Sequence, residues 1–258
     1  MATKITFIKK VKIGNAVLFT GLPGIGLVGK ICVDYMLKQL KAEKIAEITS
    51  DSFPPSVHTS KGILELIKDE LYLLKSNGTD FLFLAGPVQP SLDLRAGSAQ
   101  EHYEFANTIV ESLKHHNLKE VCALAGINIG EKRMTSQPKV IVAATSKKLL
   151  DEWQNAGAVS DKAEGLITGA AGLIPAIAFS HGIGGACLMG ETNARLVYGD
   201  QGAAKSVLEL IVKKYGIRIK MDSIEKEAKD IEKAFEQLNK QLSEEPCVEP
   251  ASKLTYVR

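Results

Sequence analysis

The sequence has little of what metal-dependent, thiol-dependent and serine-dependent enzymes use. It holds four cysteines and five histidines in 258 residues, and it contains neither a CxxC pair nor an HExxH motif. Ser180, followed by His181 and a glycine, looks like a nucleophile elbow, but no histidine lies beyond it in the chain. The serine–acid–histidine order of the α/β-hydrolases therefore cannot be assembled. We predict no metal site and no catalytic residue, and we expect the cysteines in apolar runs to be reduced core thiols.

The sequence also lacks an excess of charge and a long apolar run. Its 32 Lys and Arg against 30 Asp and Glu leave a formal net charge of +2, which gives no broad attraction to nucleic acid or to an anionic membrane. The longest nearly uncharged region, Gly165–Met189, is interrupted by Pro175 and His181, so we do not expect it to span a membrane. The N-terminus lacks the apolar stretch of a signal peptide. We therefore expect a cytoplasmic protein with no nucleic-acid and no membrane partner.

The sequence does contain short apolar runs that alternate with helical patterns. The expected strands are Ala16–Thr20, Lys44–Thr49, Phe81–Ala85, Val121–Ala125, Val140–Ala144 and Ala186–Gly190, with a hairpin over Val57–Lys75. The expected helices are Ile31–Leu40, Ser98–His116, Ser146–Asn155, Thr168–Phe179 and a helix capped by Asp200 that runs to Tyr215. Strands that alternate with helices are typical of a largely parallel or mixed sheet covered on both faces. The sequence therefore predicts an α/β fold.

The chain changes character after about residue 220. We divide it into an α/β domain over 1–220, a charged helix with a heptad pattern over 221–243, and a flexible tail over 244–258. The apolar residues of the helix recur at steps of three and four, at Met221, Ile224, Ala228, Ile231, Phe235, Leu238 and Leu242. This seam needs a partner surface. It packs either on its own domain or on another subunit or partner, through Ile224, Ile231, Phe235, Leu238 and Leu242.

A GxGxxG pattern at Gly24, Gly26 and Gly29 lies between an expected strand and an expected helix. In dinucleotide-binding folds such glycines let the backbone approach a pyrophosphate, and Asp51 could supply the acid that binds the ribose. Pro23 weakens this interpretation, because it removes a backbone donor beside the turn. The alternative is a tight strand–turn–helix crossing in which glycine lets two backbones approach each other.

Arg95 and Ser98 are a second candidate for anion binding, since Ser98 lies at an expected helix N-terminus. The capping box of Ser98 with Glu101 already explains the serine. The residues nevertheless leave an alternative function open, an enzyme or sensor that binds a nucleotide or a phosphorylated metabolite. Its expected ligand residues are Gly24, Gly26, Gly29, Arg95 and Ser98.

Several motifs together resemble the proteasome assembly chaperone 2 family, and the archaeal-type members are the closer likeness. The motifs are Val17–Gly29, Asp51–Pro55, Leu84–Gln89, Tyr103–Leu113, Gly165–Gly172 and the segment from Gly190 to Ala204. The resemblance implies a three-layer α/β/α sandwich of the phosphorylase/hydrolase-like kind, in an oligomer, without a cofactor and without a catalysed reaction. It also implies 20S proteasome α subunits, or the assembled core particle, as the partner. We therefore expect a homo-oligomer that assists proteasome assembly or binds the α-ring.

Several members of that family bind the proteasome through a C-terminal hydrophobic–tyrosine–any residue motif. Here Tyr256 is third from the end, and Thr255 stands where the hydrophobic residue belongs. One additional residue displaces a terminal carboxylate by about 3.5 Å, so the tail either docks in a shifted register or does not dock in this way. The partner-binding residues that we expect are Leu254, Tyr256, Val257 and Arg258.

Overall fold

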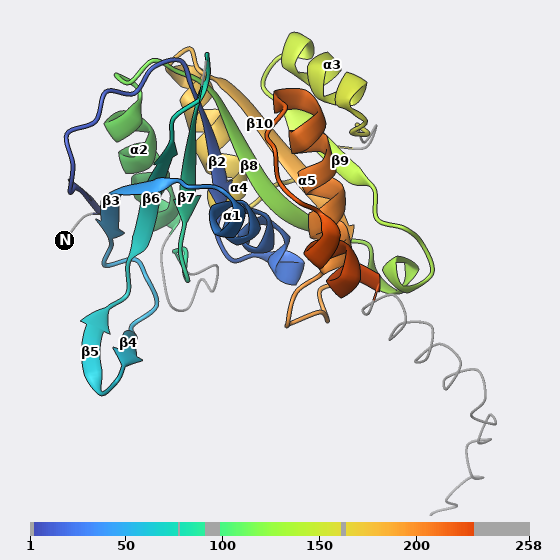
Figure 1. Cartoon of the computed structure of the whole chain (residues 1–258), viewed down its shortest axis with the longest axis horizontal. Coiled ribbons are helices and arrows are strands. Elements are labelled where there is room, and N and C mark those ends of the chain that lie inside the picture. The colour runs from blue at the N-terminus through green and yellow to red at the C-terminus, as the bar shows by residue number, and fades with distance from the viewer. Residues whose placement is uncertain (1–2, 77, 91–98, 161–163, 230–258) are drawn as a thin grey trace, which may run out of the picture.

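The computed structural model describes residues 3–76, 78–90, 99–160 and 164–229, which form a three-layer α/β/α sandwich (Figure 1). The middle layer is an eight-stranded sheet in the order β1-β3-β6-β7-β2-β8-β10-β9. Its strands are β1 (Lys4–Phe7), β2 (Ala16–Gly21), β3 (Glu43–Thr49), β6 (Asp69–Leu74), β7 (Asp80–Ala85), β8 (Leu118–Asn128), β9 (Val140–Ala144) and β10 (Gly184–Thr192). The helices are α1 (Val28–Gln39), α2 (Ala99–Leu113), α3 (Lys147–Ala156), α4 (Ala170–Ser180) and α5 (Gln201–Tyr215), with short 3-10 helices η1 (Ile25–Leu27) and η2 (Gly130–Met134). None of the helices in these ranges is long and apolar enough to cross a membrane.

The sheet is mixed, with a parallel centre and antiparallel flanks. β2 pairs in parallel with β7 and with β8, and β8 pairs in parallel with β10. The pairs β1–β3, β3–β6, β6–β7 and β9–β10 are antiparallel. Parallel neighbours need long connections, and helices supply them in the centre, whereas the short connection from β6 to β7 produces an antiparallel pair.

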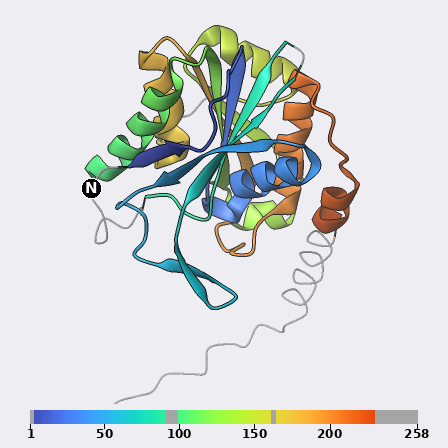
Figure 2. The same ribbon diagram turned by 60° about the vertical axis from the view of Figure 1, so that its left-hand side comes forward.

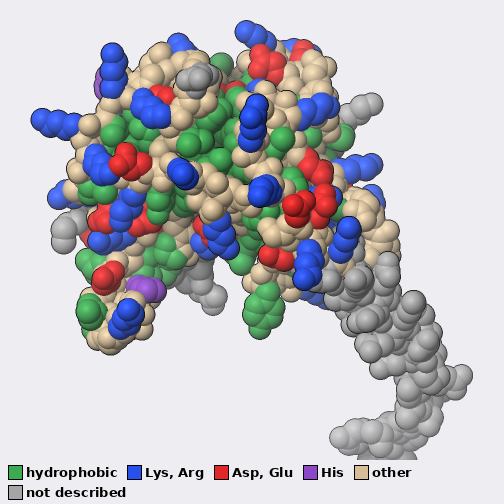
Figure 3. Space-filling view, viewed as in Figure 1, with side chains coloured by type: hydrophobic (Ala, Val, Ile, Leu, Met, Phe, Trp, Pro, Cys, Tyr) green, Lys and Arg blue, Asp and Glu red, His purple; other side chains and the backbone are tan. Residues whose placement is uncertain are grey.

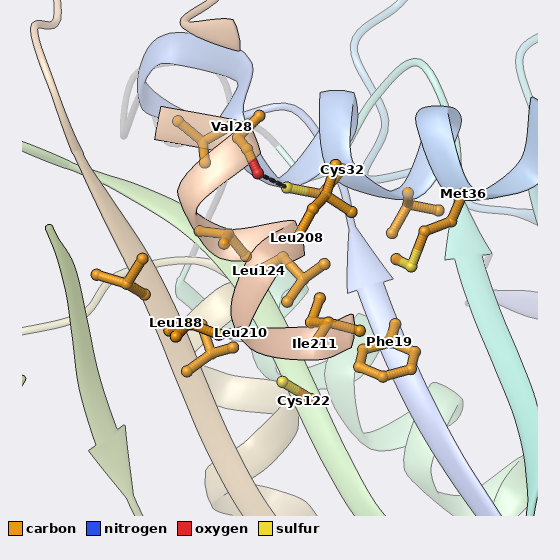
Figure 4. Close-up of a cluster of buried hydrophobic side chains, with 14 of the residues drawn as sticks. Phe19, Val28, Cys32, Met36, Cys122, Leu124, Leu188, Leu208, Leu210 and Ile211 are labelled. Carbon is orange, nitrogen blue, oxygen red and sulfur yellow. Dashed lines mark hydrogen bonds between the residues drawn. The ribbon is translucent and has the colours of Figure 1, made fainter. Parts of the chain in front are cut away.

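Helices cover both faces of the sheet, as Figure 2 shows. α1, α3 and α5 pack against one face, and α2 and α4 pack against the other. On the first face, Phe19 and Cys122 of the sheet meet Met36 of α1 and Leu208 and Ile211 of α5 (Figure 4). β2 and β7 are buried along their whole length, because alternate residues point into the two cores. The predicted α/β/α sandwich is confirmed.

Three of the four cysteines, Cys32, Cys122 and Cys187, are free and buried. Burial raises the pKa of each thiol, because a thiolate would lose its hydration in the core. The Sγ of Cys32 donates a weak hydrogen bond of 3.4 Å to the carbonyl oxygen of Ala204 (Figure 4). These three residues are core thiols, as predicted, and Cys247 lies outside the described residues.

The segment Val57–Lys75 is divided between two sheets, so its prediction as one hairpin is wrong. β4 (Val57–Ser60) and β5 (Ile63–Leu66) form a separate two-stranded sheet, and β6 joins the main sheet between β3 and β7. β6 buries Leu71 and Leu73, whereas every residue of β4 and β5 is exposed. The β4–β5 hairpin protrudes from the sandwich (Figures 1 and 2).

A helix over residues 222–229 packs on the α/β domain. Ile224 is fully buried in the core on the α1 and α5 side, and Ala228 is also buried. The hydroxyl of Tyr35 donates to the carbonyl oxygen of Lys220 at 2.6 Å and lies 2.7 Å from the hydroxyl of Ser223. Ile224 of the heptad seam therefore packs inside its own chain. Four seam residues lie outside the described ranges, namely Ile231, Phe235, Leu238 and Leu242.

Candidate functional site

The glycine turn lies at the carboxyl ends of the central strands. β2 ends at Gly21, and η1 and α1 follow it across the ends of β8 and β10. Gly26 has a φ of 60°, in the left-handed region that favours glycine. A Cβ atom on Gly26 would also lie 2.4 Å from Oγ1 of Thr192, at the end of β10. Both the backbone conformation and the available space therefore require glycine at this position.

Close contact between the turn and β8 explains why two further positions hold glycine. A Cβ atom on Gly29 would lie 1.9 Å from the carbonyl oxygen of Leu124, and one on Gly126 would lie 2.2 Å from the carbonyl oxygen of Ile25. Such backbone contacts are possible only where there is no side chain. They form the tight strand–turn–helix crossing that is the alternative interpretation of the GxGxxG pattern. Gly24 differs, because no atom lies within 4 Å of an added Cβ and the residue lines a cavity.

The position of Asp51 does not fit a dinucleotide site. Asp51 follows β3, and β6 and β7 separate β3 from β2 in the sheet. Neighbouring strands lie about 4.8 Å apart, so roughly 14 Å separates the ends of β3 and β2. In the dinucleotide fold the strand that carries this acid lies beside the strand before the glycine turn. The local pattern matches the fingerprint, but the strand order does not.

A cavity of about 390 Å³ opens beside the glycine turn, which is large enough for a small ligand. Much of its wall is apolar and comes from β8, β9 and β10, through Leu124, Ile127, Ile141, Val142 and Met189. Thr20, Gln89, Asn128 and Thr168 add uncharged polar groups, and Glu164 adds an acidic one. No lysine, arginine or histidine is among the described residues that line it. A phosphate group would find no cationic side chain in this lining.

A buried ion pair adjoins the glycine turn. Arg133 of η2 donates through Nε and Nη2 to the two carboxylate oxygens of Asp200, at 2.8 and 2.9 Å, and both side chains are fully buried. Oγ1 of Thr192 donates to the same carboxylate at 2.9 Å. The backbone amide of Asp200 donates to the carbonyl oxygen of Gly26 at 2.8 Å. The pair therefore joins η2, the end of β10 and the start of α5 to the turn.

Sequence reasoning identifies one of the two partners in this pair. Asp200 accepts from the backbone amide of Ala203 at 3.0 Å and caps α5 as predicted. Its pairing with Arg133 was missed, because the two residues lie 67 positions apart and no local signal joins them. The run Glu131-Lys132-Arg133 looks like an exposed charged loop, although the arginine is buried.

Asp69, at the start of β6, is a buried carboxyl group near the carboxyl end of β7. Within the described part of the chain, its two oxygens form no hydrogen bond of ordinary geometry. Burial raises the pKa of Asp69 well above its ordinary value, and the backbone amide of Val88 and the charge of Lys30 offset this in part. The run Lys68-Asp69-Glu70 looks like a polar turn, so the sequence gives no sign of this burial.

We expect Asp69→Asn to raise the melting temperature more at about pH 8 than at about pH 4. The pKa of Asp69 is higher in the folded chain than in the unfolded chain, so the folded state holds the proton more tightly. The free energy of unfolding therefore falls as pH rises from the ordinary pKa through the raised one. Asparagine does not titrate, so in the variant this residue no longer lowers the free energy of unfolding as pH rises. Thermal denaturation across that pH range measures the melting temperatures, with the half-exposed Asp151→Asn as control. A gain in melting temperature that is independent of pH would contradict the prediction.

The described residues offer little catalytic chemistry. Within them, no group of three or more His, Cys, Asp or Glu could hold a metal ion. Ser180 ends α4 and its hydroxyl donates to the carbonyl oxygen of Ile177 at 2.7 Å, so it does not occupy the strand-to-helix turn of a nucleophile elbow. Gly24, Gly26 and Gly29 share one turn, as expected. The remaining predicted site residues lie outside the described ranges, namely Arg95, Ser98, Leu254, Tyr256, Val257 and Arg258.

Comparison with known proteins gives a family and several relatives. The model of the PAC2 family matches residues 18–239. The uncharacterized protein MJ1210 of Methanocaldococcus jannaschii is 34% identical over 227 residues, which span 88% of this chain and 84% of that protein.

Two crystal structures from Pyrococcus furiosus resemble more than nine tenths of the chain. PbaB, described as an archaeal proteasome activator, has a TM-score of 0.82 and 29% identity, covering 92% of this chain and 99% of its own. PbaA, described as an archaeal homolog of proteasome-assembly chaperone, has a TM-score of 0.70 and 26% identity, covering 95% of this chain and 94% of its own. The likeness includes the α/β/α layers described above.

Proposed function

This chain belongs to the PAC2 family, and on that premise we propose that it is a non-catalytic protein-binding factor that assists proteasome assembly or binds the α-ring of the 20S core particle. The observation that carries the proposal is the likeness to PbaB, a proteasome activator, along almost the whole length of both chains. A fold alone does not define a function. Here the likeness also extends to sequence, at 29% identity.

The chemistry of the cavity supports a binding role over catalysis. The described part of its lining has no nucleophile paired with a base and no cation for a phosphate, which are the groups that a hydrolase or a nucleotide site requires. Gly29 is required by its contact with Leu124, and Gly26 by its contact with Thr192. These two glycines and the uncharged or acidic polar groups of the described lining do not favour the alternative function, a nucleotide or phosphorylated metabolite bound at the turn.

We assign partner contact to the C-terminal residues Leu254, Tyr256, Val257 and Arg258. Apolar residues in a segment of polar, proline-containing composition are typical of docking peptides. We assign a second contact, either between copies in a homo-oligomer or with the partner, to the seam residues Ile231, Phe235, Leu238 and Leu242. Ile224 is not available for this role, because it is buried in its own domain.

Size-exclusion chromatography with purified proteasome components tests the proposal. We expect the full chain to co-elute with the 20S core particle or with isolated α subunits from the same organism. Co-elution with α subunits alone would indicate an assembly factor, and co-elution with the finished particle would indicate an α-ring binder. Elution apart from both, at protein concentrations on the order of 10 μM, would contradict the proposal, because this exceeds the dissociation constants of most specific complexes.

A further inference from the structure

The protruding β4–β5 hairpin carries an apolar face that the described chain does not cover. Val57 pairs with Leu66 and Thr59 pairs with Leu64, and side chains alternate between the faces of a strand. These four residues therefore share one face. Val57 is 50% exposed, Leu64 68% and Leu66 70%. Figure 3 shows hydrophobic side chains on this hairpin, beyond the body of the molecule.

A two-stranded hairpin of this kind has little support of its own. Isolated hairpins are at best marginally stable in water, and they need a further strand or a packed face. The opposite face carries His58, Ser60 and Glu65 with Ile63, so the charged residues of the two strands lie away from Val57, Leu64 and Leu66. Exposed apolar patches with polar surroundings are typical of protein-interaction sites.

The hairpin lies at the same end of the molecule as a second apolar feature. It follows β3 and precedes β6, at the carboxyl end of the parallel strands. β10 ends there as well, and the loop after it exposes Val197 by 70% and Tyr198 by 93%. The loop and the hairpin both project from the lower end of the sandwich in Figure 1.

The described part of the C-terminal helix, 222–229, also reaches this end of the domain. Glu225 of the helix over 222–229 lies 3.6 Å from Lys205, in the first half of α5, which begins after the carboxyl end of β10. The helix runs onward toward the lower end in Figure 1. The described part of this helix, which is followed by 230–258, therefore ends near the same end of the sandwich as the hairpin and the Val197–Tyr198 loop.

We propose that this end of the molecule, through Val57, Leu64 and Leu66 and the loop at Val197 and Tyr198, contacts the same protein that the C-terminal segment engages. The inference rests on the proposed function, so the partner at this end is the α-ring. The part of the α-ring that makes this contact would be an apolar, uncharged strip of its surface. Two contacts on one partner reinforce each other, because the second forms within the complex.

Charge placed on one face of the hairpin tests the inference. The variant Leu64→Glu/Leu66→Glu should bind the core particle or α subunits roughly 100-fold more weakly than the natural chain, since burial of two leucines would be lost. Ile63→Glu is the matched control, because Ile63 is 64% exposed, neighbours Leu64 and points to the opposite face. It should change affinity by less than about threefold, which is about half of one tenfold step in binding free energy. Thr59→Glu, on the apolar face but without loss of a leucine, should weaken binding as well.

The outcomes separate the inference from the proposed function. If Leu64→Glu/Leu66→Glu binds the core particle or α subunits as tightly as the natural chain does, the inference is overturned and proteasome binding remains intact. A lower molecular mass of that variant in light scattering, with unchanged affinity, would assign the hairpin to contact between copies and would also overturn it. Failure of the natural chain to bind would overturn both. Circular dichroism of each variant checks that the domain is folded.

Discussion

Replacing Arg133 with methionine should lower the free energy of unfolding by about 3–5 kcal/mol. The carboxylate of Asp200 would remain fully buried without the two charge-assisted hydrogen bonds that it now accepts from the guanidinium. The hydroxyl of Thr192 and the amide of Ala203 would still donate to it, but neither carries a charge. Breaking one half of a buried pair is costly for this reason, whereas replacing both halves is often tolerated.

The exposed pair of Arg195 with Glu131 provides the matched control. Arg195 Nη1 lies 2.7 Å from Glu131 Oε1, but the two side chains are 84% and 66% exposed, so Arg195→Met should change stability little. Guanidinium denaturation, followed by the fluorescence of the single tryptophan, Trp153, measures both variants, since Trp153 is fully buried in the folded chain. Equal stabilities for Arg133→Met and Arg195→Met would contradict the importance of the buried pair.

Removing residues 244–258 should weaken binding to the proteasome partner by roughly 100-fold, the effect of losing one or two interface residues that carry most of the energy. A docking peptide concentrates its binding energy in a few apolar and aromatic side chains. Within this segment, Leu254, Tyr256 and Val257 are the residues of that type nearest its end. Surface plasmon resonance with immobilised core particle measures the change.

Single substitutions in the same segment sharpen this result. Tyr256→Ala should reproduce most of the loss, because aromatic residues dominate binding at such contacts, and Thr255→Ala should bind as the natural chain does. An affinity that truncation leaves unchanged would move the contact to the folded domain. The hairpin face at Leu64 and Leu66 would then be the main candidate for that contact.

The types and order of most elements could be predicted from the sequence, because local rules control them. Ser146 caps α3 by accepting from the backbone amide of Leu149 at 3.2 Å, and Asp200 caps α5 in the same way. Both interactions span three residues, so they are visible in the sequence. The apolar runs that form β2 and β7 are equally clear, because both faces of these strands are buried.

The order of the strands in the sheet could not be predicted in the same way. β3 follows α1 in the chain but lies three positions from β2 in the sheet, and this placement separates Asp51 from the glycine turn. Whether the GxGxxG pattern serves a ligand or a close backbone contact also depends on distant residues. Leu124 and Thr192 determine the space at Gly29 and Gly26, and neither belongs to the motif.

Burial and exposure of individual side chains were the least predictable features. Asp69 and Arg133 lie in charged runs that are typical of surface loops, yet both are buried. Leu64 and Leu66 belong to the largely apolar run Ile63-Leu64-Glu65-Leu66-Ile67, which is typical of a buried strand, yet both are exposed. In each case the outcome depends on which other segment packs there, and residues distant in the sequence supply that segment.

Sedimentation velocity of the fluorescently labelled chain, mixed with the 20S core particle of the same organism, tests proteasome binding most directly. We predict that a fraction of the label sediments with the core particle, that this fraction rises with particle concentration until it saturates, and that unlabelled chain competes it away. Label that sediments at the rate of the free chain at every particle concentration, up to about 10 μM, would contradict binding to the assembled particle.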